Sequence, residues 1–294
     1  MANTLNVNSL PEYIEQHKDE LFVKSVVGAK TLDYIEIMPG VKHKEALNYL
    51  DSTVELAEGG CGWNPAGSDT FSQRTVEVKP LSVQKEYCWL DFKNYWMNYQ
   101  LLFEAGRQTL PFEEKIAESN MNAIKEALEK AVWQGNTVIE GLLAQIDAEN
   151  DTVKVTFTDG QTATSKVDAV VNAIPTKALA KGVRLFMSYA DFRSYVAEQN
   201  ANCCSNRSII DAANEELKYV GDSRITIVPV LGLEATNKMV AAPADGLVYA
   251  TDIEGSDSVY EMRYDAKERK FDLDVLFNAG TAVKYPEEVV IGRQ

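Results

Sequence analysis

One uninterrupted helical pattern dominates the middle of the chain. The stretch PFEEKIAESNMNAIKEALEKAVW, residues 111–133, begins with a proline suited to a first helical turn, and a glycine follows just past its end. A narrow apolar stripe that includes Ile116, Ile124 and Leu128 continues for about six turns. At ~1.5 Å per residue such a helix is about 35 Å long, comparable to a whole small domain. We therefore predict a spine helix along which other elements pack.

Residues 53–86 have the pattern of a long two-stranded excursion. TVELAEGG leads out, CGWNPAGSDTF turns and SQRTVEVKPLSVQKEY returns. A lone two-stranded ribbon is marginally stable in water, so we expect a partner to complete it. The glycines around Cys61 fit a bend, and Trp63 is a large amphipathic side chain at the end of an arm that has no core of its own. We expect Trp63 to bury against a neighbouring subunit, with Cys61 as a small apolar companion.

The next segment predicts a helix with an aromatic face. Its aromatic residues recur at steps of three and four and end before a glycine: Trp89, Phe92, Trp96, Tyr99 and Phe103. Stacking on nucleic-acid bases would need interleaved basic residues, and Lys93 is the only one between Trp89 and Phe103. We interpret the aromatic face as a packing surface.

The remaining pattern is mixed α and β. A capping box at Ser9 and Glu12 predicts an N-terminal helix with one packed face, formed by Leu10, Ile14, His17 and Leu21. Asp159-Gly160 predicts the turn of a β-hairpin. An α/β lobe is expected over residues 166–254. Strict alternation predicts a half-buried strand near the C-terminus, with Phe271, Leu273, Val275 and Phe277 facing inward.

Charge and cysteine usage exclude several classes of protein. A net charge of −15 opposes nonspecific binding to nucleic acids or anionic membranes. No apolar run reaches the ~18 residues that a membrane span needs, and no signal peptide is evident, so we expect a reducing cytoplasm. The four cysteines contain no CxxC pair, which argues against a zinc site or a disulfide framework. We expect no metal and no cofactor.

No catalytic constellation assembles from the sequence. Cys61 as a nucleophile would need a histidine base, and both histidines lie upstream of every cysteine. His43 with Cys88 follows a caspase-like order but lacks the Gln-Ala-Cys signature. Asp272 and Asp274 lie on the polar side of an alternating strand, where carboxylates are usually solvated. We expect no enzymatic activity.

The order of elements resembles the Hong Kong 97-type major capsid protein of tailed bacteriophages. Similar stretches are KAVWQGN followed by EGLLAQI, then GVRLFMSYADFRSYV, and the final MRYDAKERKFDLDVLFNAGTAVKYPEEVVI. The CGW…TFSQRTVEVKPLSVQKEYC stretch resembles the extended loop of capsid proteins from phages of Bacteroidetes hosts. The resemblance implies an α+β capsid fold with an N-terminal arm, an extended β-hairpin loop, a peripheral domain carrying the spine helix and an α/β axial domain.

The resemblance also implies a domain plan and a function. The plan is an arm at 1–50, an extended loop and flanking helix at 51–108, a peripheral domain at 109–165 and 255–294, and an axial domain at 166–254. The function is self-assembly, through hexamers and pentamers, into an icosahedral virion shell that encloses double-stranded DNA without sequence-specific binding. Assembly would take place in the host bacterial cytoplasm, with portal and scaffold or decoration proteins as partners and no membrane.

Seven residues are our candidates for contacts between subunits: Cys61, Trp63, Phe71, Arg74, Trp89, Trp96 and Tyr99. Some capsid proteins of this family join subunits through a lysine–asparagine isopeptide bond. Lys79 and Lys85 lie in the corresponding region, but no motif identifies an asparagine or glutamate partner, so the crosslink is not carried over to this chain.

Two alternatives stay open. An encapsulin-like nanocompartment uses a related shell around an enzyme cargo, and neighbouring genes would distinguish it from a phage capsid. A cytosolic enzyme that uses Cys61 or a pair of acidic residues would instead form a small oligomer.

Overall fold

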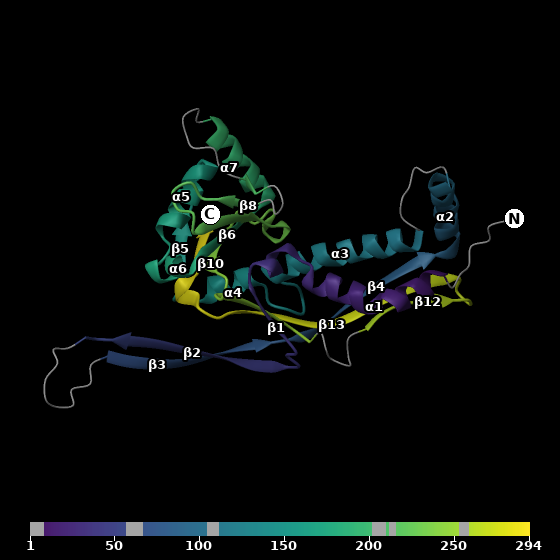
Figure 1. Cartoon of the computed structure of the whole chain (residues 1–294), viewed down its shortest axis with the longest axis horizontal. Coiled ribbons are helices and arrows are strands. Elements are labelled where there is room, and N and C mark those ends of the chain that lie inside the picture. The colour runs from purple at the N-terminus through teal and green to yellow at the C-terminus, as the bar shows by residue number, and fades with distance from the viewer. Residues whose placement is uncertain (1–8, 57–66, 105–111, 202–209, 212–215, 253–258) are drawn as a thin grey trace.

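The computed structural model describes residues 9–56, 67–104, 112–201, 210–211, 216–252 and 259–294. The predicted spine helix is confirmed as α3 (Phe112–Gln134), which runs along the centre of the molecule (Figure 1). Helix α1 (Ser9–Val27) lies beside it and buries Leu10, Ile14 and Leu21, as predicted. His17 differs, because its side chain is 44% exposed and stacks on Tyr13. The two long helices therefore pack along one shared apolar seam.

A five-stranded sheet supports these helices. Its members are β1 (Glu36–Pro39), β11 (Leu247–Thr251), β13 (Lys270–Val283), β12 (Val259–Asp265) and β4 (Lys79–Cys88). Strand β13 organises the sheet, because its first part pairs with both β12 and β4 and its last part pairs with β11. The predicted alternation is confirmed, since Phe271, Leu273, Val275 and Phe277 are all buried in one core with residues of α1 and α3.

A seven-stranded sheet forms the second lobe. In spatial order its members are β5 (Val153–Thr156), β14 (Val290–Arg293), β10 (Met239–Pro243), β6 (Val183–Met187), β9 (Ile225–Pro229), β8 (Glu216–Lys218) and β7 (Ile210–Asp211). Helices α5 (Ala163–Asn172), α6 (Thr176–Lys181) and α7 (Tyr189–Ala201) pack on one face. The other face belongs to the spine-helix core, to which it contributes Phe186, Val228 and Val240. The seven-stranded sheet thus packs against its own helices on one face and against the spine-helix core on the other, and so joins the two lobes.

The predicted hairpin at Asp159-Gly160 is wrong. Strand β5 pairs in parallel with β14 at the C-terminus instead. Gly160 does occupy a turn with φ +82°, but the chain then enters helix α5. The Thr162 hydroxyl caps that helix by accepting a hydrogen bond from the backbone N–H of Ser165. A helix cap at Thr162 therefore takes the place of the predicted second strand.

The expected domain limits and the sheets do not coincide. Strands β5 and β14, expected in the peripheral part, belong to the seven-stranded sheet, and β11, expected in the axial part, belongs to the five-stranded sheet. The short helix α4 (Leu142–Ala148) and the 3-10 turns η1 (Lys30–Asp33), η2 (Leu231–Leu233) and η3 (Pro286–Glu288) connect the elements. Among the described residues, no helix has both the length and the apolar character of a membrane span.

A third sheet, with two strands, projects from the body. Strands β2 (Lys44–Val54) and β3 (Gly67–Glu77) pair antiparallel over their whole length and extend well beyond the seven-stranded lobe (Figure 1). The predicted excursion is confirmed, although its pairing begins at Lys44 rather than near residue 53. After Val78 the chain continues directly into β4, so the hairpin is anchored in the five-stranded sheet.

Candidate assembly interface

The projecting hairpin has two chemically different faces. Residues directly opposite each other on paired strands lie on the same face of the ribbon. One face contains Leu47 and Val76, which are buried against the body at 4% and 0% exposure. The opposite face contains Asn48, Gln73 and Phe71, and all three are exposed. We call these the inner and the outer face of the hairpin.

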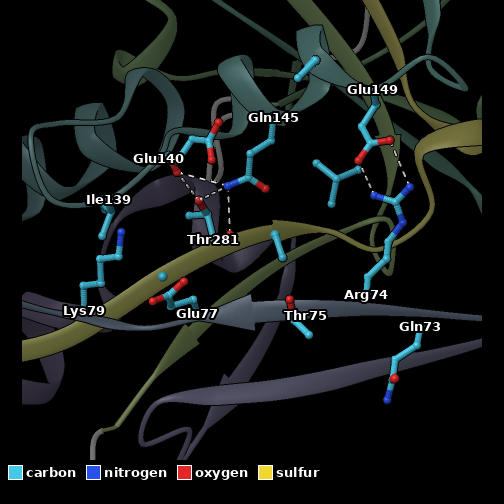
Figure 2. Close-up of a pocket in the computed structure, with 14 residues that line it drawn as sticks. Gln73, Arg74, Thr75, Glu77, Lys79, Ile139, Glu140, Gln145, Glu149 and Thr281 are labelled. Atoms are coloured by element: carbon cyan, nitrogen blue, oxygen red, sulfur yellow. Dashed lines mark hydrogen bonds and ion pairs between the residues drawn. The ribbon is translucent and has the colours of Figure 1, made fainter.

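An ion pair anchors the inner face through strand β3. The Arg74 guanidinium donates two hydrogen bonds to the carboxylate of Glu149, the residue that ends α4; the bond from Nη2 to Oε2 measures 3.0 Å (Figure 2). These bonds lower the pKa of the Glu149 carboxyl below its ordinary value of 4.5. The side chains of Arg74 and Glu149 are 28% and 30% exposed. We call this pair the arginine anchor.

The arginine anchor borders a cleft of about 450 Å³ between the hairpin base and α4. Gln145 of α4 donates to the backbone carbonyl of Thr281 at 2.9 Å, and the Thr281 hydroxyl donates to the carbonyl of Glu140 at 2.7 Å (Figure 2). These bonds join α4 to strand β13, which in turn pairs with β4. These hydrogen bonds therefore stabilise the part of the body that contacts the base of the hairpin.

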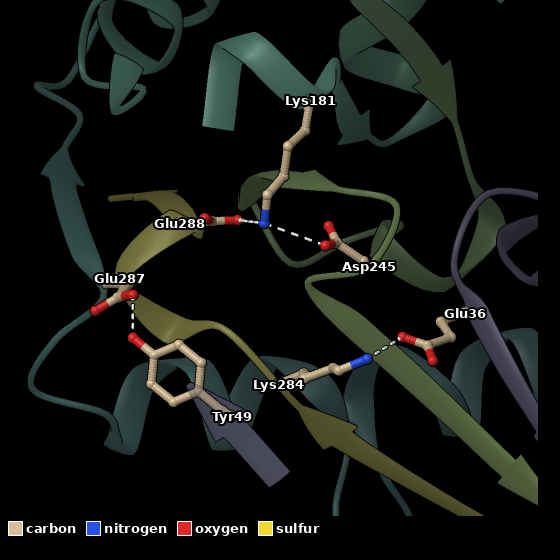
Figure 3. A network of polar contacts seen from close by, with 7 residues as sticks. All are labelled: Glu36, Tyr49, Lys181, Asp245, Lys284, Glu287 and Glu288. Atoms are coloured by element: carbon tan, nitrogen blue, oxygen red, sulfur yellow. Dashed lines mark hydrogen bonds and ion pairs between the residues drawn. The ribbon is translucent and has the colours of Figure 1, made fainter. Parts of the chain in front are cut away.

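A second anchor acts through strand β2. The Tyr49 hydroxyl donates to the carboxylate of Glu287 in η3 (Figure 3), and the Tyr49 ring meets Tyr285 edge-on with centroids 5.3 Å apart. Close by, Lys284 pairs with Glu36 at 2.7 Å. We call the Tyr49–Glu287 contact the tyrosine anchor. Because each strand has its own anchor, the body fixes the direction in which the hairpin points.

Apolar side chains are exposed on the distal part of the hairpin. Phe71 is 81% exposed, and Val54, at the end of β2, is 76% exposed. Cys61 and Trp63, the candidates at the bend, lie outside the described residues. The structure therefore places two of the candidate contact residues, Phe71 and Arg74, on opposite faces of β3, with Arg74 bound within its own subunit.

Helix α2 (Trp89–Glu104) confirms the predicted aromatic helix, and its aromatic face packs inward. The Phe92 ring lies 4.8 Å from the Phe271 ring and 5.0 Å from the Phe112 ring, measured between centroids. Tyr99 is 5% exposed, and Trp89 and Trp96 are half-buried against the same core. Within the isolated subunit these three candidates mainly hold α2 in place.

The outward face of α2 was missed by the sequence reasoning. Leu90, Tyr95 and Met97 are 66%, 55% and 50% exposed. The spacing of the aromatic residues predicted only the packed side of the helix. The sequence did contain a signal for this face, because further apolar residues lie between the aromatic positions and make α2 apolar on more than one side.

A buried asparagine, also missed, ties strand β4 to the spine. Asn120 of α3 is 4% exposed, and its side-chain oxygen accepts hydrogen bonds from Lys85 Nζ at 3.0 Å and from the Tyr87 hydroxyl at 2.7 Å. Lys85 is therefore bonded inside its own subunit. The sequence showed an asparagine within the apolar stripe of the spine, which is the signal that pointed to such a partner.

A buried carboxylate ties η1, which lies within the expected N-terminal arm, to the spine. Glu129 is 3% exposed and accepts hydrogen bonds from the backbone N–H and the hydroxyl of Thr31, the former at 3.1 Å. The same hydroxyl accepts a bond from Trp133 Nε1 at 2.7 Å. Burial raises the pKa of the Glu129 carboxyl above its ordinary value, and the bonds from Thr31 partly oppose that effect.

The candidate catalytic residues are not brought together. Cys88 is exposed at the end of β4, and Asp272 lies on the side of β13 opposite to the buried Phe271 and Leu273. The His43 backbone carbonyl accepts a bond from Val78 at the base of the hairpin. Within the described residues, no three His, Cys, Asp or Glu side chains are grouped as metal ligands would be.

No family model and no curated protein matches the sequence. Solved structures do match the fold. A chain of the satellite phage P4 procapsid has a TM-score of 0.59 at 12% identity, covering 95% of this chain and 98% of that one. A chain from Mycobacterium phage Bobi has a TM-score of 0.59 at 13% identity, and the match covers 90% of this chain and 91% of that one. A chain of a virus-like particle from Pyrococcus furiosus has a TM-score of 0.57 at 10% identity, and the match covers 96% of this chain and 100% of that one. The predicted α+β fold of the Hong Kong 97 type is thereby confirmed.

Proposed function

We propose that this chain is a shell protein that self-assembles into an icosahedral phage capsid around double-stranded DNA. The observation that carries the proposal is the hairpin, which the two anchors hold away from the body with Phe71 exposed on its outer face. A two-stranded ribbon gains little stability from its own contacts. In a closed symmetric assembly each hairpin finds the same apolar surface on a neighbour, and many modest contacts add up.

The fold and the charge support a DNA container. The solved chains that share the fold come from a phage procapsid, a mycobacteriophage and a virus-like particle. A net charge of −15 lets a shell enclose packed DNA without adhering to it. Hexamers and pentamers of this chain would form the virion, and portal and scaffold or decoration proteins would be its partners in the host cytoplasm. A Bacteroidetes host remains a prediction from the loop sequence.

The proposed domain plan follows the chain order given by the sequence, with two refinements. The extended loop is counted from Lys44, where β2 begins, because residue 50 falls inside that strand. The axial domain takes in β5 and β14, which lie in its sheet. Of the proposed contact residues, Phe71 offers the largest exposed surface among those described. Arg74 and Tyr99 would act mainly by shaping their own subunit.

A nanocompartment shell is the second candidate. The likeness to the virus-like particle from Pyrococcus furiosus, which spans the whole of that chain, favours it. Neighbouring genes separate the two: portal, terminase and protease genes accompany a phage capsid, and a ferritin-like or peroxidase gene accompanies a compartment. A small-oligomer enzyme would elute at a few subunits rather than as particles.

Shortening the hairpin tests the proposal. Tyr49 and Ser72 are direct partners across the ribbon, so residues 50–71 can be replaced by Asn-Gly, which forms a two-residue turn. Both anchors remain in this variant. We expect a folded subunit whose thermal unfolding midpoint stays within about 5 °C of the natural chain. We expect no shells by electron microscopy.

A point variant guards against a folding defect in the shortened chain. Phe71→Asp changes a side chain that is 81% exposed and so leaves the subunit fold intact. It places a charge on the outer face of the hairpin, and we expect shell yield to fall steeply. Normal shells from both variants would contradict an assembly role for the hairpin.

A further inference from the structure

The exposed apolar side chains of the subunit gather in two places. Among the described residues ten large apolar side chains are exposed, and six of them lie on or directly beside the hairpin or on helix α2. The hairpin and the residues beside it carry Val54, Leu56 and Phe71, and helix α2 carries Leu90, Tyr95 and Met97. Single exposed apolar residues are ordinary, but concentrations of this kind mark interaction surfaces.

The hairpin surface combines apolar groups with a negative charge. Phe71 and Asp69 are two residues apart on β3, so both lie on the outer face. Val54 lies on the same face, at the far end of the ribbon. The Ser52 hydroxyl donates to the Asp69 carboxylate across the strands, which holds the carboxylate in place. We call Val54, Asp69 and Phe71 the hairpin patch.

The α2 surface combines apolar groups with a positive charge. Leu90 and Met97 are seven residues apart, which is two helical turns, so they lie on one side of the helix. Lys93, the only basic residue of α2, lies between them and is exposed. We call Leu90, Lys93 and Met97 the α2 patch. Both patches therefore expose apolar side chains, and their charges are opposite in sign.

Their positions prevent one subunit from bringing its own patches together. The hairpin extends from one end of the long axis of the molecule, and α2 lies at the other end (Figure 1). A second copy that lies beyond the hairpin end, turned relative to the first, can present its α2 to the hairpin of the first. We propose that the hairpin patch of one subunit docks on the α2 patch of the next copy, with Asp69 beside Lys93. This inference rests on the proposed shell function and identifies the surface that receives the hairpin.

A contact of this type is heterologous, since two different patches meet. A docked pair still offers one free hairpin patch and one free α2 patch, so growth continues until a ring closes. A contact between two hairpins, or between two α2 helices, would instead stop at a dimer. The charges of the two patches select the heterologous contact, because each alternative places like charges together.

Charge reversal distinguishes these arrangements. Asp69→Lys and Lys93→Asp each place like charges side by side at every repeat of the contact, so we expect each variant to yield at least about tenfold fewer shells than the natural chain. The double variant restores opposite charges, and its yield should return to within about twofold. Asp91→Lys is the matched control on another side of the same helix and should leave the yield unchanged.

The outcomes separate this inference from the function on which it rests. If the natural chain forms no shells, the proposed function fails before the variants are compared. If the natural chain forms shells, the inference is overturned by normal assembly of either single variant or by a double variant that stays defective. Normal assembly of Lys93→Asp alone would assign the hairpin to a different surface.

Discussion

At the scale of single residues, Glu129 is a carboxyl group enclosed between η1 and the spine helix. Its pKa is raised chiefly by burial, so the folded subunit favours the protonated form more than the unfolded chain does. The stability that this group contributes is fully present below its ordinary value of 4.5 and is lost as pH rises through the folded pKa. The attachment of η1 to the spine should therefore be tighter in mildly acidic solution.

Glu129→Gln tests that pH dependence. The free energy of unfolding of the dissociated natural subunit, measured with urea, should decline as pH rises above the ordinary carboxyl value of 4.5, and the decline should be shallower in the variant because glutamine does not ionise. Glu126→Gln removes the same charge from an exposed site on the same helix and should retain the natural slope. Equal slopes in the natural chain and Glu129→Gln would contradict the account.

Asn120 is the second residue on which the spine depends. Asn120→Ala removes the acceptor of Lys85 and Tyr87, leaving two partly buried donors without it, and should cost about 1–3 kcal/mol of unfolding free energy. Asn122→Ala is a matched control, since Asn122 is exposed on the same helix. Urea unfolding of both variants measures the difference. Equal stabilities would show that the buried bonds contribute nothing net.

At the scale of elements, the hairpin is a thin ribbon whose direction depends on its two anchors. Arg74→Ala and Tyr49→Phe each remove one anchor, and we expect amide hydrogen exchange in β2 and β3 to quicken several-fold in each variant and further in the double variant. Exchange in α3 should not change, because neither anchor touches it. Uniform acceleration across the subunit would indicate global destabilisation instead.

Local periodicity explains which elements were predictable. The spine, the aromatic helix and the strand carrying Phe271 and Leu273 each repeat an apolar pattern over many residues, and each was confirmed. The hairpin at Asp159-Gly160 failed because a turn is compatible with several continuations, and the Thr162 cap directed the chain into a helix. The parallel pairing of β5 with β14 joins residues far apart in sequence, which no local pattern encodes.

The candidate site was predictable only in outline. The outgoing and returning stretches and the glycines of the bend indicated a projecting ribbon, but the partners of Arg74 and Tyr49 lie 75 and 238 positions away in the chain. Such pairs depend on the final packing of α4 and η3. The outward side of α2 was overlooked because packing alone decides which side of a doubly apolar helix is covered.

At the scale of the whole molecule, we expect a subunit that leaves two apolar surfaces uncovered when it is alone. The hairpin patch and the α2 patch lie at opposite ends of the molecule, and the spine helix and the five-stranded sheet lie between them (Figure 1). Such a molecule should bury both ends only by joining further copies. Its natural state would then be a closed shell rather than a monomer or dimer.

Electron microscopy of the expressed and purified chain shows whether the subunits close into a shell. We expect closed, hollow particles tens of nanometres across, in which repeated subunits form hexamers and pentamers. A monodisperse monomer or small oligomer at every protein concentration and ionic strength tried, with no particles, would contradict this expectation.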